Sequence, residues 1–376
     1  MNKKIGVLTL PAVSNYGGIL QNYALQKVLK ERGYDVITME RRFKRSNFKE
    51  FLSYCKNYTI NRLQGSFYLK VSEKNKKWLY SEQSIFKKKY IKSSPLLYTT
   101  VALNDFIKRE NIQTVIVGSD QVWRADYTPF LEDMFFCFLQ SNTSVRKVGY
   151  AASFGKDTIN YSSFQHSLIK NSLKEFSLVS VREDSGVRIC RNEFEVNAYH
   201  VLDPTMLVKR EEYINSFNLD INSKKRGVYY YLLDLDYSKK QLLDFLRGKV
   251  GKDVFCSQPK AFEGDKNTNL NDYKAPSIEN WLQGFLDADF VVTDSFHGTV
   301  FSIIFNKPFY AIVNRSKGAS RFESLLRMFD LEERLLDLQS CNLDDLNYKD
   351  EIDFAKVNEK LSKLQGESLE LLLKSI

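Results

Sequence analysis

Apolar and polar positions along this chain form short apolar runs that alternate with longer amphipathic segments. The apolar runs predict strands at residues 5–10, 34–39, 114–117, 148–153, 178–181, 227–233, 253–256, 290–293 and 309–313. The amphipathic segments predict helices at residues 19–31, 101–109, 164–176, 239–246, 278–288, 298–305 and 354–373. Strands that alternate with helices favour βαβ units and parallel sheets, so we predict the α/β class.

The alternation runs once through the first half of the chain and restarts after Pro204. At 376 residues, the chain has the length of two domains of ordinary size. We therefore predict an N-terminal Rossmann-like domain over residues 1–204 and a C-terminal Rossmann-like domain over residues 205–350. A C-terminal helix over residues 351–376 is expected to pack back on the N-terminal domain.

One stretch of the second half combines these patterns with candidate chemistry. A buried strand at 290–293 leads into a small polar loop and then into an apolar helix at 298–305, with His297 in the first helical turn beside Ser295 and Thr299. A helix start of this kind offers free N–H groups and the positive end of the helix dipole to an anion. We predict an anion site here. A histidine that only caps the helix is the structural alternative.

Two loops of the first half also follow predicted strands. The loop with Asn15, Gly17 and Gly18 lies where a Rossmann-like domain places its ligand loop, but it is not G-x-G-x-x-G and has no P-loop lysine. A standard dinucleotide or nucleoside triphosphate site is therefore not expected. The loop from Ser119 to Trp123 suits a sugar platform, because a carboxylate accepts hydroxyl protons and an indole stacks on a pyranose. A turn with an ordinary buried tryptophan is the alternative.

Two arginines complete the candidate set. Arg182 follows the strand at 178–181, where its planar group suits a carboxylate or a phosphate, and a structural pair with Glu183 is the alternative. Arg321 lies at the start of a helix for which Ser320 and Glu323 predict a capping box. We expect Arg321 to face the loop of His297.

The net charge of +9 is concentrated in one segment. Residues 41–92 hold 15 Lys and Arg against three acidic residues, a local charge of +12, so the rest of the chain carries −3. Interleaved aromatic residues make this a basic amphipathic surface, which suits an anionic membrane face, an acidic glycan or nucleic acid. Of these partners we expect the anionic membrane and not nucleic acid. A solvated helical insertion whose aromatic side chains pack on the host domain stays open as the other interpretation.

Cysteine and histidine usage bears on metals and location. The five cysteines are scattered without a C-x-x-C spacing, and the three histidines form no cluster in sequence. We expect reduced thiols, no structural zinc and a cytoplasmic location, with residues 41–92 as a peripheral contact to the inner face of the membrane. The first strand begins directly after Lys4, and no apolar run is long enough to span a bilayer, so neither a signal peptide nor a membrane span is expected.

Taken together, the loop motifs resemble those of the polysaccharide pyruvyl transferase family. In chain order they are Ser14-Asn15-Tyr16-Gly17-Gly18, Leu20-Gln21-Asn22-Tyr23-Ala24-Leu25, Gly118-Ser119-Asp120-Gln121-Val122-Trp123, Tyr150-Ala151-Ala152-Ser153-Phe154-Gly155, Ser180-Val181-Arg182-Glu183, Asp203-Pro204-Thr205, Asp294-Ser295-Phe296-His297-Gly298 and Ser320-Arg321-Phe322. The resemblance implies two Rossmann-like domains that face a cleft, as in GT-B glycosyltransferases. It also implies phosphoenolpyruvate as donor, a saccharide as acceptor and a pyruvate ketal as product, in the biosynthesis of a cell-surface polysaccharide or exopolysaccharide.

This chemistry assigns roles to the candidate residues. His297 is expected to act as general acid, because a neighbouring anion favours protonated imidazole. Asp120 is expected to accept the acceptor's proton, with Asp294 as second choice. The expected donor-binding residues, on the side of the C-terminal domain, are Arg182, Arg321, Ser295, Gly298 and Thr299. The expected acceptor-binding residues, on the side of the N-terminal domain, are Asn15, Tyr16, Gly17, Gly18, Gln21, Ser119, Gln121 and Trp123. The scheme needs neither a metal nor a cofactor, since phosphoenolpyruvate is a co-substrate.

Two rival functions stay open at this point. One is a GT-B glycosyltransferase that uses a nucleotide sugar, with His297 and Arg321 binding the diphosphate. The other is a non-enzymatic glycan-binding or membrane-binding protein that docks through residues 41–92. A serine hydrolase is not expected, because the chain has no G-x-S-x-G motif. The acceptor sugar, free or lipid-linked, is not identified by these patterns.

Overall fold

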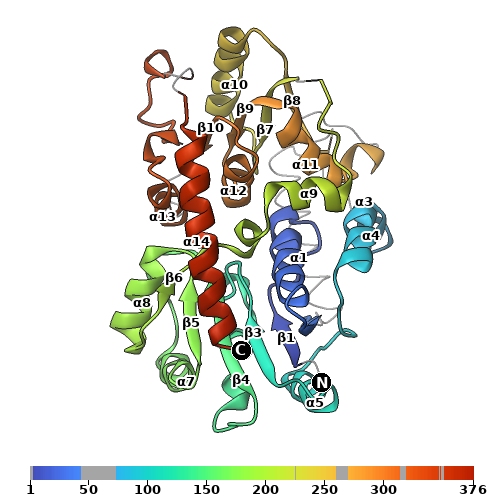
Figure 1. Cartoon of the computed structure of the whole chain (residues 1–376), viewed down its shortest axis with the longest axis vertical. Coiled ribbons are helices and arrows are strands. Elements are labelled where there is room, and N and C mark those ends of the chain that lie inside the picture. The colour runs from blue at the N-terminus through green and yellow to red at the C-terminus, as the bar shows by residue number, and fades with distance from the viewer. Residues whose placement is uncertain are drawn as a thin grey trace, which may run out of the picture.

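The computed structural model of the protein describes residues 3–43, 73–224, 226–259, 270–313, 319–346, 348 and 351–376. Within these residues the chain forms two parallel sheets, one in each of two lobes (Figure 1). The predicted α/β class with two Rossmann-like domains is confirmed. The positions of the central strands agree with the apolar runs because these strands are buried along most of their length, which is typical of parallel sheets, whereas β6 at the sheet edge is partly exposed.

The first sheet has the strand order β2-β1-β3-β4-β5-β6. Its strands are β1 (Lys4–Leu8), β2 (Asp35–Thr38), β3 (Thr114–Val117), β4 (Arg146–Ala152), β5 (Leu178–Val181) and β6 (Tyr199–His200). The helices of this half are α1 (Tyr16–Lys30), α3 (Glu73–Leu79), α4 (Ser81–Tyr90), α5 (Thr100–Arg109), α6 (Leu131–Met134), α7 (Ser163–Leu173) and α8 (Asp184–Phe194). The order reverses between β1 and β3, which makes that gap the topological switch point of the sheet.

The second sheet has the order β11-β10-β9-β7-β8 and repeats the same topology. Its strands are β7 (Gly227–Tyr231), β8 (Val254–Cys256), β9 (Ala288–Thr293), β10 (Phe309–Ile312) and β11 (Leu335–Leu336). The helices of this half are α9 (Arg210–Phe217), α10 (Tyr237–Val250), α11 (Ile278–Asp287), α12 (Phe296–Ile304), α13 (Ser320–Met328) and α14 (Phe354–Lys374). The switch point of this sheet lies between β7 and β9.

One hydrophobic core continues from the first lobe into the second. Tyr16 of α1 stacks on Trp281 of α11 at a centroid distance of 5.4 Å and meets Tyr231 of β7 edge-on at 6.1 Å. These side chains are buried members of the same apolar cluster. Aromatic contacts of this kind bury a large apolar area and hold the lobes in a fixed relation.

The helix α14 runs from the second lobe along the first (Figure 1). Gln365 Nε2 donates to the Met206 carbonyl at 2.6 Å, and the Leu202 amide donates to Ser368 Oγ at 3.1 Å. Near its end, the Ser375 carbonyl accepts a hydrogen bond from Ser177 Oγ at 2.9 Å. The helix therefore bridges the connection between the sheets and reaches the base of the first one.

Residues 44–72, the larger part of the basic segment, lie outside the described residues. Arg41, which was expected on a basic surface, is buried, and its Nε donates to Asp133 Oδ2 at 2.7 Å. In α4, Phe86 packs on Phe217 at a centroid distance of 5.1 Å, and Tyr90 packs beside it. Phe86 and Tyr90 thus pack as the host-domain interpretation expects, whereas Phe43 and Trp78 of the same flanks are exposed. Among the described residues, no helix is long and apolar enough to cross a bilayer.

Candidate active site

A cleft of about 1120 Å³ lies between the lobes at the carboxyl ends of both sheets. The loop after β3 contributes Asp120, the loop after β5 contributes Arg182, and the loop after β9 contributes His297. Ligands of open α/β sheets bind outside the carboxyl ends of the strands. The two sheets therefore present their ligand-binding edges to one common space.

The start of α12 fixes His297 at the floor of this cleft. Ser295 is the N-cap, and its Oγ accepts a hydrogen bond from the Gly298 amide at 3.4 Å, as predicted from the residue types. Thr299 is fully buried, and its Oγ1 donates to the Ser295 carbonyl at 3.2 Å. A Cβ on Gly298 would lie 2.9 Å from the Thr293 Cβ. Gly298 and Thr299 thus shape the turn and do not line the cleft, contrary to their expected contact with the donor.

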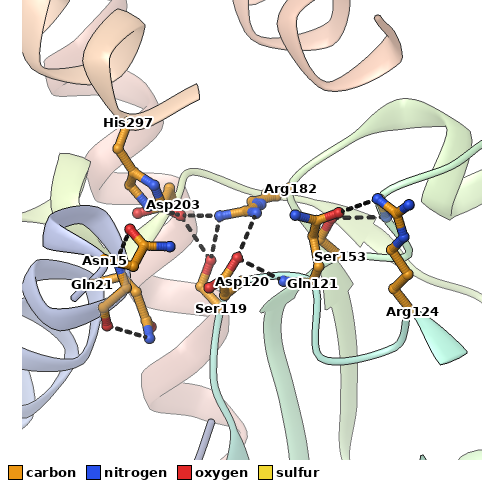
Figure 2. Close-up of polar contacts among 12 residues, drawn as sticks. Asn15, Gln21, Ser119, Asp120, Gln121, Arg124, Ser153, Arg182, Asp203 and His297 are labelled. Carbon is orange, nitrogen blue, oxygen red and sulfur yellow. Dashed lines mark hydrogen bonds and ion pairs between the residues drawn. The ribbon is translucent and has the colours of Figure 1, made fainter. Parts of the chain in front are cut away.

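A buried chain of charged and polar groups connects His297 to Asp120. Figure 2 shows Arg182 between Asp203 and Asp120, with His297 beside Asp203. Asp203 Oδ2 accepts from Arg182 Nη1 at 2.9 Å and from Ser119 Oγ at 2.7 Å. His297 Nε2 lies 3.6 Å from the same oxygen, which is a charge contact and too long for a hydrogen bond. Arg182 Nη2 lies 3.4 Å from Asp120 Oδ1.

Asp203 is the residue of this network whose role the sequence reasoning missed. Burial would raise the pKa of Asp203, but His297, Arg182 and a hydrogen bond from Thr205 outweigh burial and hold the pKa well below its ordinary value. Asp203 is therefore an anion near neutral pH, and its carboxylate contacts His297. The Asp-Pro pair was visible in the sequence, but it was interpreted as a domain boundary.

Arg321 enters the cleft from the first turn of α13, as expected. Its Nε is buried, and neither a hydrogen bond nor an ion pair reaches its guanidinium from the described residues. Burial, helped by the charge of Arg182, lowers the pKa of Arg321 to about 10, so the group stays cationic near neutral pH. Arg182 Nε is also buried without a partner. The cleft therefore holds guanidinium N–H groups to which the described residues offer no acceptor, which suits these groups to bind an anion.

Glu183 lies behind both arginines. It is fully buried, Oε1 accepts from the Phe154 amide at 2.8 Å, and burial raises the pKa of its carboxyl. The predicted alternative of a simple Arg182–Glu183 pair is not what the geometry shows, because the hydrogen bonds of Arg182 go to Asp203, Asp120 and Ser119.

Comparison with known proteins gives the family. The model of the polysaccharide pyruvyl transferase family matches residues 15–316. The chain belongs to the polysaccharide pyruvyl transferase family. No curated protein sequence is significantly similar to it.

The fold of this polysaccharide pyruvyl transferase family member is similar to those of GT-B glycosyltransferases. UGT71G1 of Medicago truncatula, solved with UDP-glucose, gives a TM-score of 0.52 at 9% identity, over 98% of each chain. UGT89C1 of Arabidopsis thaliana, solved with UDP-L-rhamnose, gives 0.51 at 9% identity, over 98% of this chain and 99% of that chain. At such identity the likeness concerns the fold alone.

Several residues expected to bind the acceptor are interior residues of this family member. Trp123 is fully buried, stacks on Phe135 at 4.8 Å and donates from Nε1 to the Met134 carbonyl at 3.1 Å. The expectation that Trp123 stacks on a sugar is therefore wrong, because its ring belongs to the core of the first lobe. Gln21 is also buried, and its Nε2 donates to Thr9 Oγ1 at 2.9 Å.

The residues near the start of α1 that were expected to bind the acceptor lie partly in the cleft and partly in the interior. Asn15 lines the cleft and caps α1 by accepting from the Gly18 amide at 3.1 Å, and Gln121 lines the cleft as well. Tyr16, Gly17, Gly18 and Ser119 do not line it. Tyr16 donates to the Pro276 carbonyl at 2.8 Å, and Gly17 lies against the ring of His297.

A set of polar contacts joins α13 to α8 across the lobes. Ser324 Oγ accepts from the Asp184 amide at 2.8 Å and lies 3.3 Å from His200 Nε2, while Arg327 Nη1 donates to Asp184 Oδ2 at 2.6 Å. These contacts hold α13, and with it Arg321, against the first lobe. The predicted capping box at Ser320 is wrong, because the helix begins at Ser320 and the preceding residue has a helical backbone with no side-chain cap.

Proposed function

We propose that this member of the polysaccharide pyruvyl transferase family transfers a pyruvyl group from phosphoenolpyruvate to two hydroxyls of a saccharide, with release of phosphate. The observation that carries the proposal is the guanidinium of Arg321, which makes no hydrogen bond to the described residues and lines the cleft together with Arg182 and His297. Phosphoenolpyruvate offers a carboxylate and a phosphate, the two anions that planar guanidinium groups bind best. We assign donor binding to Arg321 and Arg182.

In the reaction, His297 donates a proton to the methylene carbon of phosphoenolpyruvate, which becomes a methyl group. The adjacent carbon becomes an oxocarbenium centre, and a first acceptor hydroxyl adds to it and loses its proton. Phosphate then leaves, and a second hydroxyl adds to the same carbon to close the ketal. Two hydroxyl protons are released, one replacing the proton taken from His297 and the other leaving with hydrogen phosphate, so atoms and charge balance.

Asp203 supports the acid in this scheme, since its carboxylate contacts His297 Nε2 at 3.6 Å and helps to hold the imidazole in position. We assign the base to Asp120, because both hydrogen bonds that reach its carboxylate from the described residues go to Oδ1, which leaves Oδ2 for the acceptor. Asp294 is less suited, since Lys239 and the Leu233 amide each occupy one of its oxygens at 2.7 Å.

Phosphorus NMR of the protein with phosphoenolpyruvate and a panel of nitrophenyl glycosides tests the proposal. We expect phosphate to be released only when an accepted glycoside is present. His297→Ala should lower turnover by roughly 10²–10⁴-fold, the usual contribution of a general acid, while the fold is retained. Arg321→Lys should weaken phosphoenolpyruvate binding in calorimetry, because the planar two-point geometry is lost.

Unchanged turnover in His297→Ala, or unchanged donor affinity in Arg321→Lys, would contradict the assigned roles. Stabilisation of the protein by a nucleoside diphosphate, with none by phosphoenolpyruvate, would instead support a nucleotide-sugar glycosyltransferase.

A further inference from the structure

The wall of the cleft formed by the second sheet has a chemistry different from that of the arginine side. It is built at the switch point between β7 and β9, from the end of β7, the loop that follows it and the start of α10. Tyr231 ends β7, and its register partner on β9 is Thr293, the residue before Asp294. Ligands of open α/β sheets bind at such switch points.

Tyr231 presents an unpaired hydroxyl to this wall. The residue is 92% buried, since 8% of its surface is exposed, and its ring packs edge-on against Trp281 at 5.1 Å and Tyr16 at 6.1 Å. No hydrogen bond to its hydroxyl is made from the described residues, although the residue lines the cleft. The hydroxyl is not among the fully buried polar atoms that lack a partner, so it is open to the cleft, where a phenol on a fixed ring is suited to a ligand hydroxyl.

Asp294 lies beside Tyr231 and is held rigidly. Its Oδ1 accepts from the Leu233 amide and its Oδ2 accepts from Lys239 Nζ, both at 2.7 Å. Each carboxylate oxygen has a second lone pair that these contacts leave free. Lys239 is buried and forms ion pairs with both Asp234 and Asp294, so two carboxylates neutralise its positive charge.

The charge of this wall selects the chemistry of its ligand. Carboxylates from Asp234, Asp236 and Asp294 surround Lys239, so the wall is negative, while the opposite side carries Arg124, Lys156, Arg182 and Arg321. A diphosphate or a uronate would be repelled here, whereas hydroxyl groups donate readily to fixed carboxylate oxygens and accept from a phenol.

We propose that Tyr231 and Asp294 form the subsite for the acceptor sugar, and that the ring bound there carries hydroxyls and no anionic substituent. The inference rests on the proposed pyruvyl transfer and assigns the acceptor to the second lobe, opposite to the side expected from the sequence. Asp294 is three residues before His297, so a ring on this wall lies next to the reacting carbon of a donor held by the arginines.

The test compares Tyr231→Phe with the matched control Tyr127→Phe. Tyr127 also lines the cleft, but on the first lobe, where its ring lies under Arg124. Initial rates are measured with phosphoenolpyruvate and nitrophenyl glycosides of neutral hexoses, with the glucuronide as the anionic probe. The Tyr231 hydroxyl has no partner in the described protein, so Tyr231→Phe should fold with an unchanged melting temperature.

We expect Tyr231→Phe to raise the KM of an accepted neutral glycoside by about fivefold to tenfold, as for the loss of one hydrogen bond, and to leave the KM of phosphoenolpyruvate unchanged. Tyr127→Phe should change neither constant, and the glucuronide should be a poor acceptor. If the wild type transfers the pyruvyl group and Tyr231→Phe leaves the KM of the acceptor unchanged, the proposed subsite is wrong while the proposed function stands. Absence of phosphoenolpyruvate binding and of transfer in the wild type would overturn the proposed function, and the subsite with it.

Discussion

The contact between Gly17 and His297 makes Gly17→Ala an informative perturbation. Gly17 lies in the first turn of α1, in the first lobe, and the ring of His297 from the second lobe rests on it. A Cβ added at Gly17 would lie 2.7 Å from His297 Cβ and closer still to the ring atoms Cγ and Nδ1. The methyl group of alanine therefore cannot be accommodated while the imidazole stays in place.

The structure sets the size of the displacement. Ordinary van der Waals contact of a Cβ begins at 3.4 Å, so His297 Cβ must retreat by at least 0.7 Å, the difference between 3.4 Å and 2.7 Å, and the ring by more. A misplacement of about 1 Å at a reacting group costs roughly 10²-fold in rate. We expect Gly17→Ala to lower kcat by about that factor, although alanine favours a helix over glycine by up to about 1 kcal/mol.

Turnover and thermal stability are measured together for Gly17→Ala and for the control Gly248→Ala. Gly248 is in α10, and a Cβ there would meet nothing within 4 Å, so the control should gain slightly in stability at full activity. In a His297→Ala background most of the clash is removed, and Gly17→Ala should then cost less stability than in wild type. Equal costs in both backgrounds, or full activity of Gly17→Ala, would refute the reasoning.

Asp203→Asn removes the carboxylate that lies 3.6 Å from His297 Nε2 and that pairs with Arg182, so turnover should fall, and unchanged turnover would count against a supporting role of Asp203. The pKa of Asp203 is lower in the folded protein than in the unfolded chain, so the ionised carboxylate stabilises the fold. This stabilisation is complete at pH values above the ordinary aspartate pKa, and it is lost only as the pH falls through the lowered pKa of the folded state. The stability difference from Asp203→Asn should accordingly be full at neutral pH. Arg327→Ala breaks the contact between α13 and α8, so it should loosen Arg321 on α13 and raise the KM of phosphoenolpyruvate. The control Arg188→Ala loses an ion pair within α8 and should leave this KM unchanged. Equal effects of the two variants would argue for general destabilisation. If residues 41–92 bind an anionic bilayer, the protein should co-sediment with phosphatidylglycerol vesicles at low salt and be released at high salt, while no binding at low salt would remove the membrane interpretation.

The local pattern of the sequence determined the fold class and most of the elements. The apolar run at 290–293 followed by a polar turn and an apolar helix placed β9, the N-cap at Ser295 and the first turn of α12 correctly, and β3 and β5 were predicted with their observed bounds. These features depend on side-chain periodicity and on residue types within a few positions, which are properties of the chain itself. Since strands of a parallel sheet end at one edge, the pattern also placed Asp120 and Arg182 at the same edge of the first sheet, whereas the cleft that they share with His297 was implied by the family resemblance.

The tertiary structure decided which of the loop residues face a ligand and which support them. Trp123 and Gln21 lie in polar or amphipathic stretches of the sequence, yet both side chains are in the interior. Trp123 stacks on Phe135 and Gln21 donates a hydrogen bond to Thr9, and both partners come from other parts of the chain. Asp203 gains its role from His297, 94 positions later in the sequence and 3.6 Å away in space. Tyr231 appears in the sequence as one more apolar strand residue, and only the packing of its ring leaves its hydroxyl directed into the cleft. Such roles arise from contacts between residues that are distant in the sequence, and these contacts leave no periodic pattern in a single sequence.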